Sequence, residues 1–122
     1  MPSATILVVE DDAPTRIAMT HLLQMEGYSV LGAANGKEAL ELIAEHHPVL
    51  VLSDVRMPVM GGEELVARLR ELGGPPVILM TAHALVDAAA AATMGAVAVV
   101  HKPIDLDHML GLIETTMGLV PA

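Results

Sequence analysis

The chain carries Val49-Leu-Val-Leu-Ser-Asp54-Val-Arg-Met-Pro58 near its middle. The apolar, partly β-branched residues that open this segment predict a short strand, Val49–Ser53, buried on both faces. Pro58 cannot continue a central strand, so the chain has turned before it. We therefore expect Asp54 at the carboxyl end of a buried strand, which is where open α/β sheets place their ligand sites.

Apolar runs alternate with helical patterns on both sides of this segment. Four further strands are expected, at Thr5–Val9, Tyr28–Ala33, Val77–Met80 and Ala96–Val100. Five helical patterns follow these strands. The first contains Ala18 to Leu23, the second runs from Lys37 to about His47, and the third buries Leu65, Leu69 and Leu72. The fourth spans Val86–Met94, and the fifth repeats from Leu106 to Met117. Five βα units predict a doubly wound α/β fold, with a five-stranded parallel sheet and helices on both faces. The second strand is the least apolar and should lie at an edge, whereas the others should be central or well covered.

The composition narrows the class of protein. The 122 residues suffice for one domain, 1–122, and the net charge of −9 argues against binding to nucleic acid or anionic lipid. The chain has no cysteine, no signal-peptide pattern and no apolar run long enough to span a bilayer. We expect a cytoplasmic protein that binds neither nucleic acid nor membrane. Met1 and the tail Leu119–Ala122 favour a stand-alone protein over a piece excised from a longer one.

Polar side chains follow four of the expected strands. The first strand ends in Glu10-Asp11, the third in Asp54, the fourth in Thr81 and the fifth in Lys102. Because the carboxyl ends of parallel strands share one edge, three carboxylates meet there. They need a cation to remain ionised together, or one of them must stay protonated. Oxygen ligands without cysteine favour a hard cation, Mg²⁺ or Mn²⁺. Together with a hydroxyl and a lysine, this set suits phosphoryl transfer with a carboxylate as nucleophile.

These motifs resemble the receiver domain of two-component response regulators. The chain has Ile-Leu-Val-Val-Glu10-Asp11, Asp54-Val-Arg-Met-Pro58, Leu-Met-Thr81-Ala82 and Lys102-Pro103 in that family's order and approximate spacing. The resemblance covers essentially the whole chain. It implies the CheY-like, flavodoxin-like (βα)5 fold with strand order 2-1-3-4-5. It also implies a signalling domain rather than an enzyme, which catalyses at most its own phosphorylation and dephosphorylation.

The resemblance assigns roles to the acidic residues. Asp54 accepts a phosphoryl group from a histidine kinase or a histidine phosphotransfer protein. Asp11 and Asp54 bind Mg²⁺ directly, Glu10 binds it through water, and the backbone carbonyl of Arg56 completes the ligand set.

The resemblance also implies a switch. Thr81 binds a phosphoryl oxygen, Lys102 bridges to the phosphoryl group, and the bond between Lys102 and Pro103 is cis. Phosphorylation adds negative charge and strong acceptor oxygens. The response of Thr81 and Lys102 shifts the surface of the fourth helix, fifth strand and fifth helix, where an unknown output protein or domain binds.

The chain departs from the family pattern in two places. Val99 stands three residues before the lysine, where the family usually has Tyr or Phe, so coupling to the output surface is altered or weak. The alanine-rich segment Val86–Met94 lacks the basic residues through which some DNA-binding regulators pair their receivers. Arg56 and His83 flank the site at positions that tune the lifetime of the phosphoryl group.

Other interpretations remain open or are disfavoured. Because of Val99, the chain can also be interpreted as a pseudo-receiver that binds a partner without being phosphorylated. A phosphatase resembling the haloacid dehalogenases needs an acid where Arg56 stands, and Glu10-Asp11-Asp12 would repel the phosphate of a flavin. Asp12 is expected to cap a helix rather than bind a metal. The six histidines lack zinc-ligand spacing.

Overall fold

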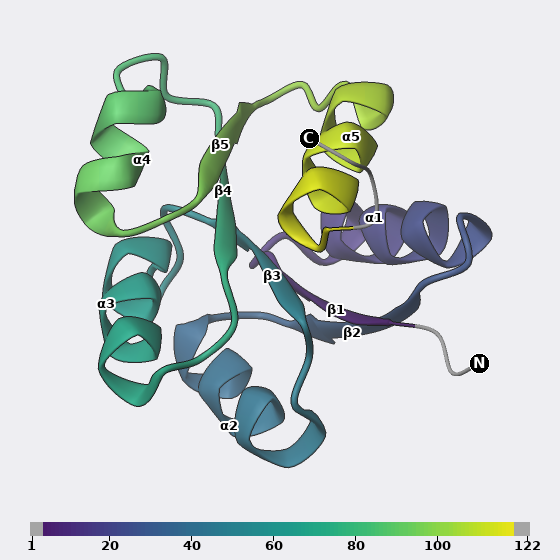
Figure 1. The fold of residues 1–122 in the computed structure, drawn as a ribbon, viewed down its shortest axis with the longest axis horizontal. Helices are drawn as coiled ribbons and strands as arrows, with labels where there is room; N and C mark the ends of the chain where they lie inside the picture. Colours follow the sequence, from purple (N-terminus) through teal and green to yellow (C-terminus); the bar gives the residue numbers. More distant parts are fainter. Residues whose placement is uncertain (1–3, 119–122) are drawn as a thin grey trace.

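The computed structural model describes residues 4–118, so Met1 and the tail Leu119–Ala122 lie outside the described residues. One parallel sheet has the order β2-β1-β3-β4-β5, and a helix follows each strand (Figure 1). The strands are β1 (Thr5–Val9), β2 (Ser29–Ala33), β3 (Leu50–Asp54), β4 (Val77–Thr81) and β5 (Ala98–His101). The helices are α1 (Ala13–Met25), α2 (Gly36–His46), α3 (Gly62–Leu72), α4 (Ala88–Met94) and α5 (Leu106–Thr116). The predicted fold class and strand order are confirmed.

The helices form two layers, with α1 and α5 on one face of the sheet and α2, α3 and α4 on the other (Figure 1). Alternate residues of each strand point to opposite faces, so the sheet contributes to two separate cores. In β1, Ile6 belongs to the core that also contains Met109 of α5, while Leu7 belongs to the core that also contains Leu65 of α3. No helix within residues 4–118 combines the length and apolarity needed to cross a membrane.

The edge strands differ in how well they are covered. The prediction that the second strand lies at an edge is confirmed, and β5 forms the other edge. All five residues of β3 and of β4 are buried, whereas Val100 is the single buried residue of β5. The prediction that the fifth strand is central or well covered was therefore wrong. An edge strand has a neighbouring strand on one side only, so an apolar sequence there is less buried.

Three predicted details were wrong. The third strand is Leu50–Asp54 rather than Val49–Ser53, and Val49 is 46% exposed. The fourth helix begins at Ala88 rather than Val86, because Asp87 caps it by accepting the N–H of Ala90. Leu72 is not buried but 74% exposed, since it is the last residue of α3 and extends beyond the packed face.

Gly62 allows α3 to begin directly against the end of β3. A Cβ at this position would lie 2.3 Å from the carbonyl oxygen of Asp54 and 3.1 Å from Cδ2 of Leu79. Gly62→Ala is therefore expected to lower the free energy of unfolding by about 2–3 kcal/mol, because the backbone at Asp54 has to move. Urea unfolding measures the change.

Gly111 in α5 is the matched control for this substitution. A Cβ there would meet no heavy atom within 4 Å. Gly111→Ala is expected to stabilise the protein by roughly 0.5–1 kcal/mol, since alanine loses less backbone entropy in a helix. Equal effects of the two substitutions would contradict the close approach at Gly62.

Candidate functional site

Three carboxylates meet at the carboxyl end of the sheet. Val9 pairs with Ser53 across β1 and β3, so the residues that follow, Glu10 and Asp54, become neighbours. One oxygen from each of Glu10, Asp11 and Asp54 lies within 4.8 Å of the others. Glu10 and Asp54 are 1% and 7% exposed, whereas Asp11 is open to solvent. The sheet topology thus brings the sequence-predicted acids together.

The backbone and side chain of Glu10 are both held. Its N–H donates to the carbonyl of Ala33 at 3.0 Å, and its Oε1 accepts the N–H of Asp12 at 3.2 Å. Arg16 in α1 donates from Nη1 to the carbonyl oxygen of Glu10 at 2.7 Å. Sequence reasoning missed this role of Arg16. The available signal was a basic residue one turn into the helix that follows an acidic loop.

Asp12 caps α1, as predicted, and does not join the acidic cluster. Its carboxylate accepts the N–H of Thr15 at 3.1 Å.

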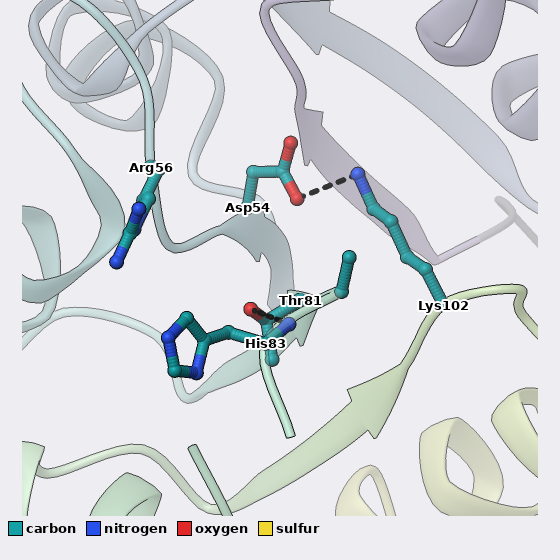
Figure 2. A pocket seen from close by; sticks show the side chains of 6 residues that line it. Asp54, Arg56, Thr81, His83 and Lys102 are labelled. Atoms are coloured by element: carbon teal, nitrogen blue, oxygen red, sulfur yellow. Dashed lines mark hydrogen bonds and ion pairs between the residues drawn. The ribbon is translucent and has the colours of Figure 1, made fainter. Parts of the chain in front are cut away.

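Lys102 forms ion pairs with both buried acids. Its Nζ lies 2.8 Å from Oδ1 of Asp54 and 2.9 Å from Oε2 of Glu10. Figure 2 shows the lysine reaching Asp54 from one side, with Arg56 on the other side. Glu10, Asp54 and Lys102 lie at the ends of three different strands, β1, β3 and β5. One positive charge is therefore shared between two carboxylates that lie side by side.

The pKa values of Asp54 and Glu10 shift in opposite directions. Burial and the neighbouring Glu10 together raise the pKa of Asp54 to about 7, although Lys102 acts to lower it. Burial also acts to raise the pKa of Glu10, but hydrogen bonds with Asp54, Lys102 and the backbone of Asp12 outweigh it and lower that pKa. Burial acts to lower the pKa of Lys102, but its contacts with both acids raise it. The pair therefore holds one proton more readily than two separate carboxylates would.

Asp54→Asn is expected to stabilise the protein when divalent cations are absent. The pKa of Asp54 is about 7 in the folded protein against an ordinary value of 3.8, so ionising this group disfavours folding. The free energy of unfolding of the asparagine variant should therefore exceed that of wild type by little near pH 4. The difference grows as the pH rises and is constant above about pH 7, at about 1–3 kcal/mol. Urea unfolding in EDTA across this pH range measures it. An advantage that shrinks as the pH rises would contradict the assignment.

An open hollow lies beside the acids. It encloses about 310 Å³ and is lined by Asp54, Arg56, Thr81, Ala82, His83 and Lys102. Thr81 is buried, whereas Arg56 and His83 are exposed at the rim. The peptide bond between Lys102 and Pro103 is cis. The hollow thus brings together Asp54 and four other residues that the sequence singled out.

Thr81 already has partners in this arrangement. Its hydroxyl oxygen accepts the N–H of His83 at 3.0 Å (Figure 2), and its carbonyl accepts the N–H of Lys102 at 2.8 Å. Val99 does not line the hollow and packs instead with the core on the side of α2, α3 and α4.

The donor set fits a hard divalent cation. The grouped side chains offer carboxylate oxygens alone, which are the ligands that Mg²⁺ and Mn²⁺ prefer. Asp11 is exposed and is not paired with Lys102, so it offers an accessible first ligand.

The chain is similar to known proteins along most of its length. A family model described as the response regulator receiver domain matches residues 6–114. The regulatory protein AtoC of Escherichia coli K12 is 38% identical over 93% of this chain, which spans 25% of the length of AtoC. Sporulation initiation phosphotransferase F of Bacillus subtilis is 32% identical over 98% of both chains. The crystal structure of a CheY-like response regulator receiver domain protein from Methanospirillum hungatei has a TM-score of 0.86 at 30% identity, over 95% of this chain and 94% of that one.

Proposed function

This chain belongs to the response regulator receiver domain family of two-component signalling, and we propose that it accepts a phosphoryl group on Asp54. The phosphodonor is a histidine kinase or a histidine phosphotransfer protein. Residues 1–122 act as one receiver domain. The observation that carries the proposal is the Asp54 carboxylate on an open hollow, within 2.8 Å of the Lys102 ammonium and beside two further acids.

The transfer follows from the position of Asp54. A carboxylate oxygen of Asp54 forms the new bond to phosphorus while the phosphorus–nitrogen bond of the donor's phosphohistidine breaks. The ammonium of Lys102 favours the ionised, nucleophilic form of Asp54 and lies where negative phosphoryl oxygens would arrive.

Glu10, Asp11 and Asp54 would hold Mg²⁺ or Mn²⁺, with the backbone carbonyl of Arg56 completing the ligand set. The bound cation would neutralise charge on the phosphoryl oxygens.

The switch acts through Thr81 and Lys102. Phosphorylation turns the Asp54 carboxylate into an acyl phosphate with roughly −1.5 to −2 charge. Lys102 then exchanges a carboxylate partner for a phosphoryl oxygen, and the Thr81 hydroxyl donates to another. Their movement shifts the surface formed by α4, β5 and α5, to which the output protein or domain binds. Arg56 and His83, at the rim of the hollow, set how readily water reaches the acyl phosphate.

A second candidate is a pseudo-receiver that binds its partner without phosphorylation. The specific observation in its favour is Val99, which has no aromatic ring to turn inward when Thr81 moves.

Intact-mass spectrometry with acetyl phosphate distinguishes the two candidates. The wild-type protein is expected to gain the mass of one phosphoryl group in Mg²⁺ and none in EDTA. No gain in either buffer, from protein that unfolds cooperatively, would support the pseudo-receiver. A gain that is independent of divalent cations would contradict the metal site.

A further inference from the structure

The loop between β4 and α4, residues 82–87, is anchored at both ends by side chains from outside it. At its start, the Thr81 hydroxyl accepts the N–H of His83 at 3.0 Å. At its end, Nε2 of His101 lies 2.8 Å from the carbonyl oxygen of Val86. Within residues 4–118, no other outside side chain forms a hydrogen bond with the backbone of this loop.

The two anchoring residues are neighbours in the sheet. Thr81 in β4 pairs with His101 in β5, and the adjoining N–H of Lys102 donates to the Thr81 carbonyl at 2.8 Å. Inside the loop, the N–H of Val86 donates to the carbonyl of His83 at 3.1 Å. Hydrogen bonds therefore connect Thr81 to Val86 at the end of the loop, and Val86 through His101 in β5 back to Thr81.

His101 lies on the same side of β5 as Val99. Residues two apart on a strand point to one face, and Val99 packs on the face that carries α4. Val99 offers neither an aromatic ring nor a polar group. Since a carbonyl oxygen can only accept, Nε2 of His101 donates the hydrogen bond to Val86.

We propose that His101 is the positioning residue through which movement of Thr81 reaches α4. This inference rests on the proposed function, because it takes Thr81 to be the residue that senses the phosphoryl group. A Thr81 hydroxyl that turns toward phosphorylated Asp54 gives up the N–H of His83, which frees the start of the loop. His101 continues to hold Val86, one residue before the Asp87 cap of α4. The freed loop then pivots about Val86 and displaces α4. A loop released at both ends would move without displacing the helix, because nothing would connect its movement to α4.

Hydrogen–deuterium exchange read by mass spectrometry tests both parts of this proposal. The variants are His101→Ala, His101→Gln, whose amide can donate to the same carbonyl, and His108→Ala. His108 is an exposed histidine of α5 whose ring forms no hydrogen bond with any of residues 4–118, so it serves as the matched control. Each protein is measured alone and after incubation with acetyl phosphate and Mg²⁺, and phosphoryl uptake is weighed on the same samples.

Without phosphodonor, residues 82–87 of His101→Ala are expected to exchange roughly three- to tenfold faster than wild type, the effect of losing one hydrogen bond. The glutamine and His108 variants should match wild type. With phosphodonor, wild type and His101→Gln should change their exchange in residues 88–94. His101→Ala should not, although it gains the phosphoryl group as they do.

Three results overturn the proposal. The first is unchanged exchange of residues 82–87 in unphosphorylated His101→Ala. The second is a wild-type change of exchange in residues 88–94 of phosphorylated His101→Ala, and the third is failure of His101→Gln to restore the wild-type response. Absence of phosphoryl uptake by wild type would refute the proposed function and, with it, the transmission through His101. The comparison of unphosphorylated proteins would still decide whether His101 anchors the loop.

Discussion

Asp54→Asn is expected to show no detectable gain of a phosphoryl group from acetyl phosphate in Mg²⁺. Its rate of phosphoryl uptake should be at least roughly a thousandfold below that of wild type. An amide nitrogen or oxygen is a poor nucleophile, and neither neighbouring acid can replace the lost carboxylate. Glu10 is 1% exposed and bound to Lys102 and the N–H of Asp12. Asp11 does not line the hollow in which Asp54, Thr81 and Lys102 meet. Intact-mass spectrometry over a time course measures the loss.

Asp12→Asn is the matched control for this experiment. It makes the same chemical change in the acidic segment after β1, and asparagine caps helices about as well as aspartate. Its uptake is expected to stay within about twofold of wild type, because Asp12 lies outside the acidic cluster. If Asp54→Asn still gained a phosphoryl group, fragmentation of the labelled peptide would identify another acceptor and refute the proposed site.

Lys102→Met is expected to have two opposite effects. Phosphoryl uptake should fall roughly 10²–10³-fold, because the variant lacks the ammonium that meets the developing charge. Mg²⁺ should bind more tightly, by at least roughly threefold, because the competing cation on Glu10 and Asp54 is gone. Initial rates at saturating Mg²⁺ and titration calorimetry measure the two effects separately.

Arg68→Met controls for the change in net charge. Arg68 is exposed on α3 and pairs with Glu64 at 3.4 Å, away from the acids. Both its uptake rate and its Mg²⁺ affinity should match those of wild type. Weaker Mg²⁺ binding in Lys102→Met would show that the lysine supports the metal site rather than competing with it.

Periodicity and residue chemistry were enough to predict the architecture. Short apolar runs that alternate with helical patterns predicted five parallel strands, and the small, less apolar second run predicted an edge. These inferences succeed because burial of apolar side chains imposes a local period on helices and strands. They failed at Leu72, which continues the helical period but lies past the last turn that packs against the sheet.

The sequence by itself also determined which groups gather at the site, because Glu10, Asp11, Asp54, Thr81 and Lys102 follow strands whose carboxyl ends share one edge. Only the tertiary structure decided how these groups pair. Lys102 binds Glu10 and Asp54 together, Arg16 holds the carbonyl of Glu10, and His101 reaches Val86 across the loop. Such contacts depend on strand register, helix position and side-chain reach between residues far apart in the chain. A local pattern of hydrophobicity carries no information about those distances.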